Sequence, residues 1–596
     1  MPARAKSLLI ASAALALALP ALAQDRPDPA AAPPAAAENA AAAAPSPTTT
    51  LAPAPDRSAA ERAGSSGSDI VELIELSELE MPKAPIPVEL PQHARRDPAL
   101  VGALDPEQLG LGSNPWGGAS GAFLSGLMRR METPIASRWA HIALRNALLA
   151  RSPAPRNVNP VEWTAERAWL LLRLGEADAA RMLVAGVDVD RFTPKMFQVG
   201  VQSALATADP PALCPLEDGI RKVERRVHPL VEAMCAALAG EPESAAAQID
   251  SARRRGLASG IDLVLAEKVV GAGADTGRAV TVEWEPVKQL NSWRFGLASA
   301  TGMTLPERLT EDAPVRLRAW QARAPLLTPE DRLDSARLAT GLGVFSSQAL
   351  IDLYSAIYDR TDPDDLSESD AWRLRLAFVG KDREARLAAM RRLWSIGEGS
   401  LQREASRALL GRAAARIAPD PDLQADAPNL IASMLAAGYD REAARWNAAV
   451  RRMDDQFADR CWAMLALAAP DAAGLDLSYG RINSFISRDD SPNRKRGALL
   501  VAALAGSGRL DARGAARLNR RYGLRLERQS RWTRMIDAAA AMGQAGSAVV
   551  LAGTGFQAEQ FEDIPSSHLF HAVAALRRTG QDFTARMIAA EALART

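Results

Sequence analysis

The sequence has few aromatic residues, few cysteines and few histidines. Phenylalanine, tryptophan and tyrosine make up only 5% of its 596 residues, and this scarcity argues against an all-β sandwich or barrel, whose strands favour aromatic side chains. Alanine and leucine dominate instead, and 48% of the residues are hydrophobic. A chain of this length and composition can bury a large core, either in several globular units or in one long repeat array.

Neither sign of charge is in excess. Lysine and arginine number 71, as do aspartate and glutamate. Residues 1–23 contain two basic residues, Arg4 and Lys6, and no acid, so their removal leaves 69 basic against 71 acidic residues and a net charge of −2. Binding to nucleic acid depends on a basic surface, and the composition therefore predicts no nucleic-acid partner.

The sequence also lacks the short motifs that mark common catalytic, phosphate-binding and zinc sites. It contains no HExxH, no GxxxxGK[ST], no GxSxG and no cysteine–histidine set with zinc-site spacing. Of the histidines, only His568 and His571 lie one helical turn apart, and Ser566 and Ser567 before them fit a helix start. We therefore expect no catalytic residue, no metal ligand and no cofactor, and no enzyme activity.

Long apolar runs are absent after the first 23 residues, so no transmembrane segment is expected in the mature chain. Residues 1–23 begin with two basic residues, continue with an apolar stretch and end in the small-x-small sequence Ala21-Leu22-Ala23. This order predicts a secretory signal peptide cleaved after Ala23. Eight lysines against 63 arginines, with abundant Ala, Gly and Pro, indicate a GC-rich bacterial genome. The expected compartment is then the periplasm.

Two segments separate the signal peptide from the body of the chain. Residues 24–68 are rich in Ala and Pro and contain almost no large apolar residue, which predicts a disordered tether. Residues 69–118 form a lead-in that starts with the acidic, amphipathic sequence IVELIELSELE. This sequence is interpreted as a motif that docks on a partner or back on the protein, or alternatively as a poorly ordered lead-in helix. The apolar residues expected to dock are Ile70, Leu73, Ile74 and Leu76.

A glycine-rich stretch with Trp116 at its centre closes the lead-in. Residues 105–121 read DPEQLGLGSNPWGGASG, and the glycines favour a structured loop that caps the first helices, with a ligand-binding loop as the alternative.

Two of the three cysteines are placed to pair. Cys214 precedes a proline at an expected helix start, and Cys235 lies 21 residues later in the next apolar helix. An exported protein meets an oxidising compartment, so a Cys214–Cys235 disulfide is expected, with three reduced, buried thiols as the alternative. Cys461 would then be a free, buried thiol, and no CxxC indicates redox catalysis.

Residues 119–596 are expected to form one amphipathic helix after another, because apolar residues recur at helical spacing between breaks at Gly, Pro and Asp. Six glycines each end an Ala- or Leu-rich helix and are followed by an alanine five residues later. This spacing predicts antiparallel helical hairpins, in which glycine ends one helix and the small alanine lets the second approach it. The six pairs are Gly175 and Ala180, Gly240 and Ala245, Gly380 and Ala385, Gly438 and Ala443, Gly543 and Ala548, and Gly580 and Ala585.

With this pattern the chain resembles tetratricopeptide-repeat (TPR) proteins. In that family a small residue on the first helix, a turn glycine, an alanine five residues on and a further small residue seven beyond it hold each hairpin together. Ala233, Gly240, Ala245 and Ala252 match all four positions. The resemblance covers residues 160–596 and implies an all-α solenoid of stacked hairpins after a disordered N-terminal segment; a non-repeating all-α fold is the alternative.

Repeat arrays of this kind offer extended surfaces to other proteins. The resemblance therefore implies a non-catalytic periplasmic scaffold or assembly factor that binds an envelope protein or peptide. Two alternatives stand beside it: a subunit of an enzyme that acts on the cell wall, and a module that binds glycan or lipid through the loop around Trp116.

Overall fold

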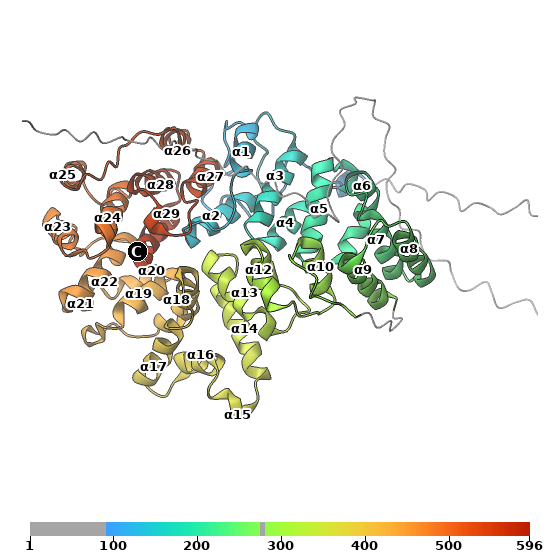
Figure 1. The fold of residues 1–596 in the computed structure, drawn as a ribbon. Coiled ribbons are helices and arrows are strands. Elements are labelled where there is room, and N and C mark those ends of the chain that lie inside the picture. Colours follow the sequence, from blue (N-terminus) through green and yellow to red (C-terminus); the bar gives the residue numbers. More distant parts are fainter. Residues whose placement is uncertain (1–90, 275–280) are drawn as a thin grey trace, which may run out of the picture.

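The computed structural model describes residues 91–274 and 281–596. Within these residues the chain is a succession of short helices, and its backbone forms no strand beyond two isolated bridges, Leu104 with Ala150 and Ser120 with Arg156. The predicted all-α fold is confirmed (Figure 1). The expected signal peptide, the tether and the motif residues Ile70 to Leu76 lie outside the described residues. In the part that is described, no helix is both long enough and apolar enough to span a bilayer.

The first helices pack as an antiparallel group in which α3 contacts α4 and α5, and α1 and α2 contact α3. Their bounds are η1 (Gln92–Ala94), α1 (Gly121–Met128), α2 (Arg138–Leu149), α3 (Pro160–Arg173), α4 (Ala177–Val184), η2 (Val189–Arg191) and α5 (Pro194–Ala206).

A second group continues from α5, with α7 packed between α8 and α9, and α10 returning onto α5. Its elements are η3 (Pro210–Leu216), α6 (Glu217–Val223), α7 (His228–Leu238), α8 (Pro242–Arg254), α9 (Gly260–Gly273), α10 (Ser292–Ala300), α11 (Glu307–Glu311) and α12 (Val315–Gln321).

The third group is arranged around α18, which contacts α13, α14, α16, α17 and α19. Local signals set its first boundary: Thr328 Oγ1 accepts a hydrogen bond from the Asp331 amide, and Pro329 occupies the first position of α13. The elements are α13 (Pro329–Leu342), α14 (Ser347–Arg360), α15 (Pro363–Leu366), α16 (Asp370–Val379), α17 (Arg383–Trp394), α18 (Ser400–Ala414), η4 (Pro421–Leu423) and α19 (Ala427–Ala436).

The last group ends in α29, which contacts α19, α22, α24 and α28. Its elements are α20 (Asp440–Ala444), α21 (Asn447–Val450), α22 (Asp455–Ala468), α23 (Tyr479–Arg488), η5 (Pro492–Arg494), α24 (Lys495–Gly506), α25 (Ala512–Tyr522), α26 (Arg531–Ala541), α27 (Ala545–Gly555), η6 (Phe561–Asp563), α28 (Ser566–Arg578) and α29 (Asp582–Arg595).

Five of the six glycines from the repeat pattern make the same turn. Each has a positive φ, and in each the following residue donates its amide to the carbonyl five positions back, which closes the helix end. The next helix begins two residues after the glycine, and the alanine five residues after it is buried between the helices. The five pairs are Gly175 and Ala180, Gly240 and Ala245, Gly438 and Ala443, Gly543 and Ala548, and Gly580 and Ala585.

The sixth glycine, Gly380, makes a different turn. Its φ is −52°, and α17 begins three residues after it, at Arg383. The cause is Asp382, whose side chain accepts the amide of Ala385 and so becomes the N-cap of α17. Ala385 is consequently only half-buried. The hairpin of α16 and α17 exists, but its turn does not belong to the glycine–alanine class.

The positive φ at these turns predicts a measurable cost for substitution. At Gly240, φ is +83° and an added Cβ would meet no atom within 4 Å, so Gly240→Ala isolates the backbone conformation and should destabilise the protein by about 1 kcal/mol. Gly126 lies inside α1 with equal open space but without a positive φ, and Gly126→Ala should be neutral or stabilising. Urea unfolding midpoints of the two variants measure the difference, and equal shifts would contradict the assigned turn.

The two ends of the helical array meet. Helices α1 and α2 pack against α27, and α2 also packs against α29 (Figure 1). The glycine-rich loop adds to this contact: the amide of Gly546 donates to the carbonyl of Pro115 at 2.8 Å, and Gln581 Nε2 donates to the carbonyl of Leu109 at 2.8 Å. The first helices of the chain thus share their packing with the last.

Candidate protein-binding groove

Helices α14, α16 and α18 enclose a groove with an apolar floor. Its cavity measures about 390 Å³ and is lined by Ile351, Tyr354 and Tyr358 of α14 and by Leu374 and Phe378 of α16, among others. At its edge Val379 is 63% exposed, which is unusual for a large apolar side chain at a helix end. A second hollow of about 300 Å³ shares two of its lining residues and continues the groove toward α2 and α19.

Three arginines line the groove, and we refer to it as the arginine groove. The Arg375 guanidinium lies 5.2 Å from the centre of the Tyr358 ring, and that of Arg416 lies 5.6 Å from the Phe378 ring. Arg412 of α18 lies four residues before Arg416, which follows the end of that helix, and donates to the side-chain amide oxygen of Gln348 on α14 at 3.3 Å. All three arginines are exposed.

The charge of these three arginines, unlike that of Arg391, is not neutralised by a carboxylate of the described residues. Arg391 pairs with both Asp426 and Glu384, and many further arginines bind a carboxylate. Across residues 91–274 and 281–596, by contrast, no ion pair is formed by Arg375, Arg412 or Arg416. A single acid, Asp359, lines the same cavity. The groove is therefore apolar at its floor and has an excess of positive charge at its rim.

The hollow toward α2 extends the apolar surface. Trp139, Ile142 and Tyr439 line it together with the first residues of α14. The Trp139 ring is held edge-on against Phe583 of α29, with the ring centres 5.4 Å apart. This part of the groove is thus built on the contact between the two ends of the chain.

A larger cavity of about 690 Å³ lies between α4, α5, α7, α9 and α10 and has different chemistry. Met182, which is 55% exposed, and Leu238 contribute its apolar surface. Its charged side chains are paired: Arg181 binds Asp209 at 2.7 Å, and Asp178 binds Arg323 outside the cavity lining at 2.5 Å. This cavity therefore offers apolar contact without a surplus of either charge.

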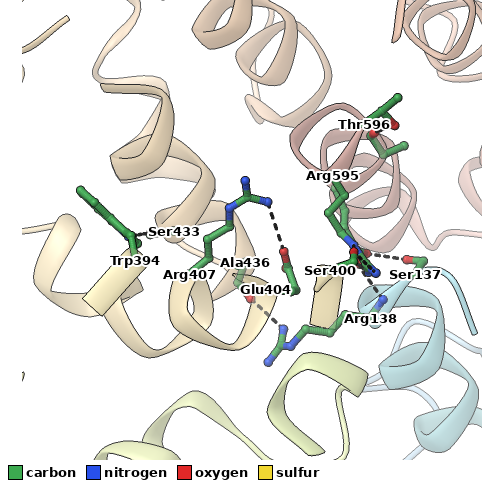
Figure 2. Close-up of polar contacts among 12 residues, drawn as sticks. Ser137, Arg138, Trp394, Ser400, Glu404, Arg407, Ser433, Ala436, Arg595 and Thr596 are labelled. Atoms are coloured by element: carbon green, nitrogen blue, oxygen red, sulfur yellow. Dashed lines mark hydrogen bonds and ion pairs between the residues drawn. The ribbon is translucent and has the colours of Figure 1, made fainter. Parts of the chain in front are cut away.

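The densest cluster of buried ionisable groups lies where α2, α18 and α29 meet, and its contacts are structural (Figure 2). Arg138 donates to the carbonyls of Thr340 and Ala436 at the ends of α13 and α19, at 2.9 and 2.7 Å. Arg407 pairs with Glu404 at 3.6 Å. Burial lowers the pKa of Arg138 and raises that of Glu404. Glu404 is only 2% exposed, and the contacts of this cluster join the helices to one another.

The cysteines and Trp116, which the sequence singled out, are part of the packing of the fold. Cys214 and Cys235 are joined by a disulfide that links η3 to α7, with their Cα atoms 5.5 Å apart. Trp116 is fully buried, and its ring nitrogen donates to Ser152 Oγ at 3.0 Å, so the ring is not available to stack on a ligand. Cys461 is a free, buried thiol, and burial raises its pKa to about 12.

The two C-terminal histidines also serve the packing of helices. His571 Nδ1 lies 2.9 Å from Asp537 Oδ1, and the His568 ring packs on Trp532 with the ring centres 4.4 Å apart. Among the described residues, no group of three or more His, Cys, Asp or Glu side chains is placed to hold a metal ion.

Sequence reasoning did not identify the arginine groove. Its signals are visible in hindsight as pairs at helical spacing, Tyr354 with Tyr358, Leu374 with Phe378, and Arg412 with Arg416. Such pairs are common on helices, however, and only the packing of three helices separated along the chain brings these six side chains to one surface.

In the comparisons with known proteins, no family model, no curated protein and no solved structure matches the chain.

Proposed function

We propose that the protein is a non-catalytic periplasmic scaffold or assembly factor that binds segments of envelope proteins in the arginine groove. The observation that carries the proposal is the combination of an apolar, aromatic floor with the exposed and unpaired Arg375, Arg412 and Arg416. Exposed apolar surface with a polar rim is typical of sites that bind other proteins.

The groove favours a particular kind of segment. A helical or extended peptide with apolar residues on one side would cover the floor, while acidic residues beside them would meet the arginines. Arginine on an aromatic ring is a frequent anchor at protein interfaces because it combines contact area with bidentate binding of carboxylates. The proposed ligand is therefore an acidic, amphipathic segment.

The proposed location rests on two features of the sequence and one of the structure. The N-terminal 23 residues have the pattern of a cleaved signal peptide, and the chain has no later long apolar run. The disulfide between Cys214 and Cys235 fits an oxidising compartment. Fractionation of cells that express the tagged chain tests the location, which would be contradicted by recovery from the cytoplasm with an intact N-terminus.

Charge reversal in the groove tests the proposed function. The mature chain, tagged at its C-terminus, is crosslinked in intact cells and purified, and the recovered proteins are compared with those of Arg412→Glu/Arg416→Glu. We expect a defined set of envelope proteins with the wild type and their loss with this variant, because attraction of carboxylates becomes repulsion.

The chain offers a matched control for this experiment. Arg517 and Arg521 lie one turn apart on α25, are exposed, and also lie over tyrosine rings. Arg517→Glu/Arg521→Glu should retain the recovered proteins. Equal recovery from wild type and the groove variant would exclude the groove as the binding surface, and recovery of glycan or lipid without protein would favour the alternative of a glycan- or lipid-binding module.

A further inference from the structure

We propose that residues 70–80 of this same chain bind in the arginine groove and compete there with the partner. The proposal rests on the proposed function, because it concerns the same site, and it assigns the groove an occupant that the chain carries itself. It makes the N-terminal part of the chain a regulator of partner binding.

The chemistry of the segment complements that of the groove. The sequence IVELIELSELE places apolar residues at helical spacing, at Ile70, Leu73 and Ile74, which matches the way an amphipathic helix enters an apolar groove. Four carboxylates lie among them, and the groove presents three arginines without a carboxylate partner in the described part of the chain. The four acids are Glu72, Glu75, Glu78 and Glu80.

A short stretch of chain joins the segment to the described body of the protein. Pro91 is the first described residue, and the fourteen residues between it and Leu76 let the two lie up to about 50 Å apart. A linker that spans the distance to the groove gives its segment an effective concentration in the millimolar range, at which even a weak affinity keeps the groove largely occupied. A partner must then bind more tightly than the segment, or displace it by also binding elsewhere.

The cavity that contains Met182 is the competing location, and its chemistry argues against it. Arg181 there is neutralised by Asp209, and Asp178 is paired with Arg323, so the lining offers no free positive charge. A segment with four glutamates would gain apolar contact in that cavity but no favourable charge. The arginine groove offers an apolar floor to the apolar residues of the segment and positive charge to its glutamates.

Crosslinking in the purified, full mature chain tests the proposal. A photoreactive amino acid replaces Val379, which is exposed at the rim of the groove, and adducts are mapped by mass spectrometry. We expect adducts on residues 70–80. Mixing unlabelled with isotopically labelled chains separates adducts within one chain from those between chains, and we expect adducts within one chain.

Charge reversal then connects the adducts to the arginines. Arg375→Glu/Arg412→Glu should weaken the affinity of the segment for the groove roughly tenfold and lower the adduct yield, since two favourable charge pairs become repulsive, whereas Arg517→Glu/Arg521→Glu should leave the yield unchanged. Adding Glu75→Arg and Glu78→Arg to the groove variant should restore the yield, a rescue that a folding defect would not show. High salt should lower the yield in the wild type.

Each other outcome overturns the proposal in a distinct way. Adducts elsewhere in the chain, or a yield that is indifferent to both reversals, exclude residues 70–80 as the occupant. Adducts only between chains replace the intrachain contact with contact to a second copy. If residues 70–80 form no adduct while envelope proteins are still captured through the groove, the proposed function stands and this inference fails.

Discussion

Replacing Glu591 by alanine is expected to lower the free energy of unfolding by about 3–5 kcal/mol, because it removes one member of a buried charged network and leaves its partners unpaired. Glu591 lies on α29, and its carboxylate accepts hydrogen bonds from Ser137 Oγ at 2.6 Å, from the amide of Arg138 at 2.8 Å and from Arg595 Nη1 at 2.6 Å. The carboxylate thus caps the start of α2 from the far end of the chain.

The cost is large because the donors that Glu591 leaves behind stay buried. The side chain of Arg595 is 2% exposed, and it also donates to the carbonyl of Ala136 at 2.6 Å and to Ser400 Oγ, so it cannot turn toward water without losing these contacts (Figure 2). The first turn of α2 would also lose the negative group at its positive end. The contact between the two ends of the array is therefore expected to weaken as a whole.

Glu384→Ala provides the control for this prediction. Glu384 also binds an arginine, Arg391, at 2.6 Å, but its side chain is 70% exposed, and its removal should cost less than about 1 kcal/mol. Urea unfolding of wild type and both variants measures the difference. Similar shifts for Glu591→Ala and Glu384→Ala would show that the network does not hold the two ends together.

Removing the disulfide between Cys214 and Cys235 is expected to cost about 3 kcal/mol. The bond closes a loop of 21 residues, and a loop of that size restricts the unfolded chain by about this amount in the chain-entropy model. Unfolding of Cys214→Ala/Cys235→Ala, compared with wild type with and without a reducing agent, measures the effect. The reducing agent should destabilise the wild type and leave the double variant unchanged.

Cys461→Ala is the companion control, because Cys461 is the free thiol in the described part of the chain. The stability of this variant should depend on the reducing agent as strongly as that of the wild type. Loss of the dependence in Cys461→Ala, or its persistence in the double variant, would contradict the assigned pairing.

The sequence predicted much of the local structure, because the signals for helix ends are local. Thr328 and Pro329 have the residue types typical of a helix start and begin α13, and glycines such as Gly175 and Gly438 adopt the left-handed conformation at the turns of hairpins. These residues act through hydrogen bonds within five positions of the chain, which a sequence displays directly.

The two most similar turn sequences, GKDREA and GYDREA, show where such reasoning fails. In the first, Asp382 caps α17 by accepting the amide of Ala385 at 2.8 Å. In the second, Asp440 lies inside α20 and binds Arg586 of α29 at 2.8 Å. The same residue type thus takes a local role in one copy and a long-range role in the other, and the deciding partner lies 146 positions away.

The closure of the array and the arginine groove were beyond prediction for the same reason. Glu591 and Ser137 are separated by 454 positions, and no periodicity in a single sequence identifies which charged residues meet at such distances. Arg138 illustrates the point: it reads as one arginine among 63, yet it binds the ends of two helices, α13 and α19. The planar guanidinium, with several donors in a fixed arrangement, suits this role better than lysine.

Photocrosslinking in intact cells, from two positions of the mature chain, tests whether the arginine groove is the surface that binds other protein segments. One photoreactive residue replaces Val379 at the arginine groove, and the other replaces Met182 at the larger apolar cavity; both sites are more than half exposed. If the arginine groove is the binding surface, adducts with envelope proteins, or with residues 70–80, form from position 379, and few form from position 182. Adducts that form from position 182 and not from position 379 would contradict this prediction.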